Sequence, residues 1–254
     1  KSPRWVLFKM KDLAQAQAIF KEINGKELTE SEITEIQSEQ EPANQKPLFS
    51  KTYRFPIILA FLIAFFNQLS GINAFLYYAP RIFEAAGLQE SAALLSSIGI
   101  GVTNLIFTLL GLYLIDKIGR RLLMIIGSIG YIISLSLVSI AFLQGWQGIS
   151  IPIFLFLFIA SHAIGQGAVI WVFISEIFPD SLRAQGQSFG CSVHWVLAAL
   201  ITLFMPVALS AFPNPGYVFI LFAGMMVLQL VFVLFMMPET KGISLERLSK
   251  LLIK

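Results

Sequence analysis

Six long apolar segments, separated by short turn-like or charged stretches, dominate the pattern of hydrophobic and polar positions along the chain. A helix needs about 20 predominantly apolar residues to cross a hydrocarbon core about 30 Å thick. Backbone groups in lipid must find their hydrogen-bond partners within the segment, so each segment is expected to be helical. The pattern therefore predicts an all-α integral membrane protein with six transmembrane helices. The predicted spans are residues 55–79, 91–115, 122–142, 151–174, 184–209 and 217–236.

The composition agrees with this class of protein. The chain has 254 residues, of which 56% are hydrophobic and only 13% are charged, whereas soluble domains carry about 25% charged residues. A single cysteine, Cys191, rules out a disulfide within the chain and is interpreted as a small packing residue.

The basic residues predict the orientation of the chain in the membrane. Seventeen of the 18 Lys and Arg residues precede the first span, follow the last one, or lie in the loops after the second and fourth spans; only Arg81 falls on the opposite side. By the positive-inside rule, both termini are expected on the cytoplasmic side of the cell membrane. The same distribution accounts for the net charge of +3 without a nucleic-acid partner.

Three regions are expected: a cytoplasmic amphipathic helical segment and linker over 1–50, the transmembrane bundle over 51–238, and a cytoplasmic tail over 239–254. In the first region we expect one short helix that ends near Gly25 and a second after Thr29, which forms a capping-box pattern with Glu32. The chain does not begin with Met, so we expect an N-terminal portion to be missing.

The first span contains a polar, uncharged cluster. Asn67, Gln68 and Asn73 place three carboxamides around Gly71 in an otherwise apolar segment, where unpaired amides are costly. This pattern favours a neutral, hydroxyl-rich ligand such as a sugar; the alternative is that the amides only bond neighbouring helices. In an ideal helix Gln68 and Asn73 lie about 140° apart around the axis, so they share a face only if the helix bends, which Gly71 would permit.

The fourth span has a similar interruption. Gly165 and Gly167 flank Gln166 and favour bending, and Trp171 follows one turn beyond with an indole N–H and a flat apolar face. Trp171 is therefore either a sugar contact or an interfacial residue. Glycine-interrupted spans with polar groups near mid-membrane are typical of transporter sites between inverted repeats, here a three-plus-three arrangement.

Isolated polar residues in two other spans have two interpretations each. His194 and the adjacent Trp195 in the fifth span, and Asn104 in the second, could face the same cavity or only bond neighbouring helices. His162 in the fourth span could likewise contact the ligand or only bond a neighbouring helix.

Charged residues of both signs flank the spans on the predicted cytoplasmic side. A network between them could latch one conformation, since even a small difference in energy biases two similar states. The alternative is that the arginines only set topology, but this leaves the acids unexplained. The residues are Asp116, Arg120, Arg121, Glu176, Arg183 and Glu239.

No pattern typical of catalysis occurs in the chain. No Asp or Glu lies in the middle of a predicted span, and no metal-ligand spacing, Walker loop or nucleophile triad occurs. We expect no enzyme activity, no cofactor and no metal site.

Five separated motifs resemble, in order and spacing, those of the sugar porter family of the major facilitator superfamily. They are Ser2-Pro3-Arg4-Trp5; Gln68-Leu69-Ser70-Gly71-Ile72-Asn73 with Tyr77-Tyr78; Asp116-Lys117-Ile118-Gly119-Arg120-Arg121; Trp171 with Ser175-Glu176-Ile177-Phe178-Pro179 and Arg183; and Pro238-Glu239-Thr240-Lys241-Gly242.

The resemblance implies the C-terminal half of a twelve-helix transporter, preceded by the cytoplasmic segment that joins the halves. It implies sugar contacts at Gln68, Asn73, Asn104, Trp171 and Trp195, and an extracellular gate at Tyr77 and Tyr78. Bending for the gate at Gly165 and Gly167 is expected from the two glycines themselves. It also implies that the charged set locks the cytoplasmic side in the outward-open state. The partners it implies are a small neutral sugar or polyol, the lipid bilayer and the missing N-terminal six-helix half.

The chain departs from the family pattern at the implied site. Asn67 stands where the family usually has Gln, His162 where an aromatic residue is common, and His194 where an amide usually precedes the tryptophan. We therefore expect a specificity that the sequence does not name.

The function expected from these residues is sugar transport by alternating access, as proton symport with protons as a further partner. The proton-carrying group would then lie in the missing half. The alternatives are facilitated diffusion, a transporter-like sensor that binds sugar without flux, and a structural subunit with no need of a polar cavity.

Overall fold

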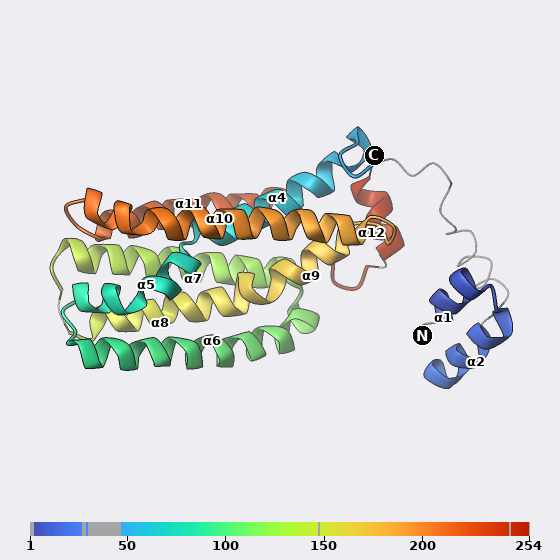
Figure 1. Cartoon of the computed structure of the whole chain (residues 1–254), viewed down its shortest axis with the longest axis horizontal. Helices are drawn as coiled ribbons and strands as arrows, with labels where there is room; N and C mark the ends of the chain where they lie inside the picture. Colours follow the sequence, from blue (N-terminus) through green and yellow to red (C-terminus); the bar gives the residue numbers. More distant parts are fainter. Residues whose placement is uncertain (1–2, 27–28, 30–46, 147, 244, 254) are drawn as a thin grey trace. The chain divides into compact units, whose positions relative to one another are not determined.

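The computed structural model describes residues 3–26, 29, 47–146, 148–243 and 245–253. The chain divides into two compact units, Lys1–Pro47 and Leu48–Lys254. All regular secondary structure in the described residues is helical, which agrees with the predicted all-α class (Figure 1).

The first unit contains the helices α1 (Pro3–Trp5) and α2 (Leu13–Asn24) and the π-helical turn η1 (Val6–Met10) between them. Asp12 caps α2, because its side chain accepts a 2.9 Å hydrogen bond from the backbone N–H of Gln15. Gly25 ends the helix with φ 70°, a conformation that favours glycine. This confirms the first short helix; the second predicted helix lies outside the described residues.

The described residues of the second unit form six helical stretches that are long and apolar enough to cross a membrane, and each overlaps one predicted span. Figure 1 shows these helices side by side along one direction. The elements are η2 (Lys51–Tyr53), α4 (Arg54–Leu69), α5 (Ile72–Ala85), α6 (Glu90–Ile118), α7 (Arg120–Leu143), α8 (Ser150–His162), η3 (Ala163–Gly167), α9 (Ala168–Glu176), α10 (Arg183–Ala211) and α11 (Gly216–Phe235), followed by the short α12 (Leu245–Leu252).

Both interruptions predicted within the spans are present. The first crossing breaks between α4 and α5, where Gly71 has φ 81°. The fourth crossing passes from α8 to α9 through the π-helical turn η3, which contains Gly165, Gln166 and Gly167. Each break lies where glycine lowers the cost of leaving the α-helical path.

Two expected turns are shorter than the sequence suggested. The predicted first span ends at residue 79, before a turn-like stretch, but α5 continues through Pro80 to Ala85 and buries Ile82 and Phe83 in the core. Only Gly119, with φ 93°, separates α6 from α7. Packing thus extends helices into stretches that proline and charge mark as breaks.

The core lies between the first, third, fourth and sixth crossings. In the first and fourth crossings, 61% of an apolar stretch of 18 residues is buried inside the protein, whereas the corresponding share is only 17% in α6 and in α10. These two helices therefore present long exposed apolar faces. The C-terminal tail packs against the bundle, because Leu248 and Leu252 of α12 are buried in the same core.

A glycine pair lets the fourth crossing approach α7 closely. A Cβ atom on Gly127 would lie 2.9 Å from the Cα of Gly165 and 3.1 Å from the carbonyl oxygen of Ser161. Gly165 therefore has a packing role in addition to its place in the π-helical turn, since backbones approach this closely only at small residues.

We expect Gly127→Ala to lower the apparent melting temperature of the detergent-purified protein. Overpacking costs about 1–3 kcal/mol and outweighs the roughly 1 kcal/mol that alanine gains over glycine in a helix. Gly224→Ala on α11 is the matched control, because nothing lies within 4 Å of its Cβ position. A Gly127→Ala protein that melts at or above the unmodified one would contradict this packing.

Candidate functional site

The break in the first crossing is built from local hydrogen bonds. The hydroxyl of Ser70 donates to the carbonyl of Asn67 at 2.6 Å, and the N–H of Gly71 donates to the carbonyl of Gln68 at 2.9 Å. A side chain at Gly71 is excluded twice, by its positive φ and by the ring of Phe222, which would lie 2.5 Å from a Cβ atom. Glycine is therefore required at this position.

The break brings the three carboxamides of the first crossing together. Asn73 Nδ2 donates to Gln68 Oε1 at 2.8 Å, although an unbroken helix would hold these side chains on different faces. Gln68 Nε2 donates in turn to Asn67 Oδ1 at 2.8 Å. Asn67 and Gln68 are buried and Asn73 is half-buried. The predicted bend thus serves to join Gln68 and Asn73.

The fifth crossing adds an imidazole to this cluster. Gln68 Nε2 lies 3.1 Å from His194 Nδ1 and 3.2 Å from His194 Nε2. The His194 ring lies against two indoles, with centroid distances of 4.9 Å to Trp171 and 5.0 Å to Trp195. His194 is buried, Trp171 is half-buried and Trp195 is 61% exposed. Six predicted site residues from three crossings therefore lie in one polar and aromatic cluster, which we call the amide–indole cluster: Asn67, Gln68, Asn73, Trp171, His194 and Trp195.

The remaining predicted residues of the membrane region lie elsewhere. Asn104 is half-buried on α6, and its side chain makes no hydrogen bond with any described residue. Tyr77 on α5 is 67% exposed. Tyr78 donates its hydroxyl proton to the backbone carbonyl of Thr202 at 3.3 Å, which links α5 to α10. Gly167 lies next to His162, whose carbonyl oxygen would be 3.3 Å from an added Cβ.

Three further buried polar contacts lie in the bundle, and the two that Gln229 makes were not foreseen from the sequence. Gln166 Nε2 donates to Gln229 Oε1 on α11, and Gln229 Nε2 donates to the hydroxyl of Ser128 on α7 at 2.8 Å. The hydroxyl of Tyr131 lies 2.5 Å from His162 Nδ1. A lone amide in an apolar span was the available signal for Gln229, as it was for Asn104.

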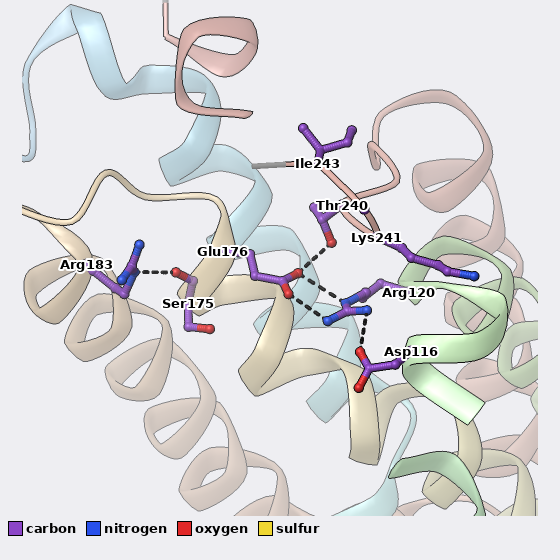
Figure 2. A pocket seen from close by; sticks show the side chains of 9 residues that line it. Asp116, Arg120, Ser175, Glu176, Arg183, Thr240, Lys241 and Ile243 are labelled. Atoms are coloured by element: carbon purple, nitrogen blue, oxygen red, sulfur yellow. Dashed lines mark hydrogen bonds and ion pairs between the residues drawn. The ribbon is translucent and has the colours of Figure 1, made fainter. Parts of the chain in front are cut away.

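Four residues of the predicted charged set, Asp116, Arg120, Glu176 and Arg183, line an open pocket of about 550 Å³ at one end of the bundle (Figure 2). Figure 2 shows Arg120 at its centre, between Glu176 and Asp116. Arg120 binds Glu176 through two bonds, at 2.8 and 3.2 Å, and Asp116 at 3.0 Å. Thr240 adds a 2.5 Å hydrogen bond to Glu176. The planar guanidinium thus joins α6, α7 and α9, and Thr240 brings the segment after α11 to the same carboxylate.

Glu239 belongs to this end of the bundle but makes no ion pair among the described residues. Its carboxylate accepts hydrogen bonds from the backbone N–H groups of Arg120 and Arg121 at 3.0 and 3.1 Å, and from those of Thr240 and Lys241 at 2.9 Å each. It therefore caps the N-terminus of α7, where a negative charge is favourable.

Two arginines of the predicted set bind other partners. Arg121 donates to the carbonyls of Val233 and Leu234 at the end of α11, at 3.2 and 2.5 Å. Arg183 lines the pocket but pairs with Asp180 and donates to the Ser175 carbonyl at 2.8 Å. Of the predicted charge network, the structure joins Asp116, Arg120 and Glu176 directly.

The fold defines the class of protein as a helical membrane protein, since the described residues contain six helices long and apolar enough to cross a membrane. The pattern of the family described as "Sugar (and other) transporter" matches residues 1–252. The chain belongs to this family, whose relatives named below are transporters and not enzymes.

Curated relatives match the whole chain. It is 34% identical to the arabinose-proton symporter of Bacillus subtilis (strain 168), covering 100% of this chain and 55% of that protein. It is also 34% identical to the facilitated glucose transporter member 3 of Canis lupus familiaris, covering 98% and 52%. The chain therefore spans about half the length of the curated relatives it matches.

Solved structures of XylE match the fold at 30% identity. A mutant of XylE with two introduced tryptophans aligns with a TM-score of 0.85 over 98% of this chain and 54% of that one. The proton:xylose symporter XylE of the major facilitator superfamily, bound to 6-bromo-6-deoxy-D-glucose, aligns with a TM-score of 0.80 over 99% and 54%. The chain thus has the six-helix half of a major facilitator fold.

We expect Arg120→Lys to lower the apparent melting temperature by several degrees. Lysine keeps the charge but loses the planar fork that holds Glu176 and Asp116 together, and hydrogen bonds to charged groups contribute about 1.5–3 kcal/mol each. Arg81→Lys, at an exposed position on α5, is the control. Equal melting temperatures for the two variants would show that the fork geometry does not stabilise the fold.

Proposed function

We propose that this chain is the C-terminal, six-helix half of a transporter that moves a small neutral sugar or polyol across the cell membrane by alternating access. The observation that carries the proposal is the amide–indole cluster at the break in the first crossing. Carboxamides both donate and accept hydrogen bonds, which matches hydroxyl groups, and the faces of Trp171 and Trp195 suit the C–H faces of a sugar ring.

The electrostatics of the cluster favour a neutral ligand. None of its six residues is an acid, a lysine or an arginine. A charged ligand at this depth would lack a counter-charge, and an unpaired charge in an apolar environment is very costly. In our proposal the substrate is bound at the cluster, with Asn104 of α6 as a further contact.

The proposal requires a second half. The apolar faces of α6 and α10 are largely exposed, and the chain covers only about half of its relatives. An N-terminal six-helix half would cover part of these faces and close the cavity, with residues 1–50 as the joining segment and 239–254 as the tail, both cytoplasmic. The positive-inside distribution of Lys and Arg supports this orientation.

Gating is proposed at both ends. Tyr77 and Tyr78 would close the extracellular side, with bending of the fourth crossing near Gly165 and Gly167. The cytoplasmic side would be latched by the pocket residues, among which Arg120 and Glu176 form the central ion pair. Latching needs only a small difference in energy between two states.

We expect Gln68→Ala and Trp171→Ala each to reduce sugar uptake by the full-length protein in proteoliposomes at least about tenfold, equivalent to about 1.4 kcal/mol. The first removes the amide that holds Asn73, and the second removes the ring that packs on His194. Gln144→Ala, outside the cluster at the end of α7, is the control and should transport normally. Normal uptake in the two cluster variants would refute the site.

We propose proton symport as the mode of coupling, with the proton-carrying group in the other half. Relatives of both modes match the chain, since the arabinose-proton symporter and the facilitated glucose transporter are equally similar to it. Saturable uptake that an inward proton gradient stimulates is expected for a panel of hexoses, pentoses and inositol. Uptake at the same rate with and without the proton gradient would mean facilitated diffusion. Sugar binding without uptake would mean a sensor.

A further inference from the structure

Two buried carboxamides lie in the core outside the amide–indole cluster. Gln166 lies in the π-helical turn η3 and Gln229 lies on α11, and both side chains are 0% exposed. Gln166 Nε2 donates to Gln229 Oε1, and Gln229 Nε2 donates to the hydroxyl of Ser128 at 2.8 Å. These three residues form a hydrogen-bonded link from the fourth crossing through α11 to α7, which we call the glutamine–serine bridge.

The hydroxyl of Ser128 anchors the glutamine–serine bridge on α7. It donates its own proton to the carbonyl of Met124 at 2.7 Å, so it accepts from Gln229 and leaves the Gln229 oxygen facing Gln166. The other polar atom of the Gln166 side chain, Oε1, is buried and has no hydrogen-bond partner among the described residues. The bond to Gln229 is therefore the contact that holds the Gln166 amide.

The turn that contains Gln166 determines the direction in which Trp171 points. A π-helical turn joins residue i to residue i+5, which is one residue more than an α-helical turn spans. Because each residue of an α-helix turns the chain by about 100°, the helix beyond such a turn is rotated by about that angle. Trp171 lies beyond the turn on α9, with its ring centroid 4.9 Å from that of His194. Without the turn, Trp171 would face another side of the crossing.

Gln166 is the residue of this turn whose side chain can hold it from outside. The other four residues of η3 have apolar side chains or none: Ala163, Ile164, Gly165 and Gly167. The two glycines lower the cost of leaving the α-helical path, but they offer no side chain that could bond a neighbouring helix. The bond between Gln166 and Gln229 supplies that link.

We infer that Gln166 and Gln229 are positioning residues of the transport site: their hydrogen bond holds the π-helical turn, and the turn directs Trp171 toward His194. The consequence for sugar binding rests on the proposed function, whereas the effect on the turn does not. The alternative is that the two amides only join apolar helices. In that case the stability of the bundle would depend on them and the affinity for sugar would not.

The test removes the two amides singly and together in the full-length protein. Gln166→Met and Gln229→Met each leave one buried amide without its partner, so each should lower the apparent melting temperature by several degrees. The double variant has no amide at either position. Its melting temperature should return to within about 2 °C of the unmodified protein, because replacing both partners by apolar groups of similar shape is nearly neutral.

The affinity for sugar should not return with the stability. Equilibrium binding of labelled D-xylose and D-glucose to the double variant should stay at least about threefold weaker than to the unmodified protein, which is the loss expected when an aromatic ring leaves its contact. A structure of the double variant tests the same point without sugar. Residues 163–167 should form an α-helical turn, and the Trp171 ring should no longer lie against His194.

Two serines of α7 provide a matched pair of variants. Ser128 and Ser139 are both buried and both bond α11, but Ser139 donates to the carbonyl of Gly216 at 2.8 Å, outside the glutamine–serine bridge. Ser128→Ala should weaken sugar binding about twofold or more, because Gln229 loses its anchor, and Ser139→Ala should leave it unchanged. This pair replaces the methionine variants if those do not insert into the membrane.

The possible failures are distinguishable. An unmodified protein that binds no hexose, pentose or inositol overturns the proposed function, and the structure of the double variant still decides whether the amides hold the turn. A double variant with restored stability and unmodified affinity, or with the π-helical turn intact, overturns the inference. A double variant that melts as low as the single variants shows that the two amides do not stabilise each other and overturns it as well. Equal affinities in the two serine variants have the same meaning.

Discussion

A buried carboxamide in an apolar helix must find a partner, and this requirement shapes the site. Gln68 is fully buried in the first crossing, and an unbroken helix would leave it without Asn73. The chain breaks at Gly71, which is the residue that fits both the positive φ and the ring of Phe222. Asn73 then reaches Gln68, and Gln68 reaches His194 on α10. The carboxamide of Gln68 is thus linked to the bend through Asn73 and to α10 through His194, whose ring lies against the indole of Trp171.

Charged residues join the helices at the end of the bundle that holds the pocket. Arg120 joins three helices through Glu176, Asp116 and the carbonyl of Ile115, and Glu239 binds four backbone N–H groups around the start of α7. These contacts differ in kind. The ion pairs run between side chains of different helices, whereas the Glu239 cap joins the N-terminus of α7 to the segment that follows α11.

Much of this fold follows from sequence pattern. The six spans, both glycine interruptions and the all-α class were predicted correctly, because hydrocarbon allows only helices at these lengths and glycine is the residue that tolerates a break. The predicted ends of the helices were less accurate than the predicted spans. Pro80 marks a turn locally, yet burial of Ile82 and Phe83 carries the helix on to Ala85. Gln229 passed unnoticed, since its partners Gln166 and Ser128 lie on other helices.

The residue types of the candidate site, and the need for a bend between Gln68 and Asn73, could be read from the chain, because both depend on spacing along one helix. The partner that Gln68 finds on another helix could not be read from the chain. That depends on His194, 126 positions away from Gln68, and on how α10 packs against α4. Likewise the acids near the helix ends were evident, but their division into ion pairs at Glu176 and a helix cap at Glu239 arises from the contact between α7 and the exit of α11. Local sequence specifies where polarity must be satisfied, and helix packing specifies by which partner.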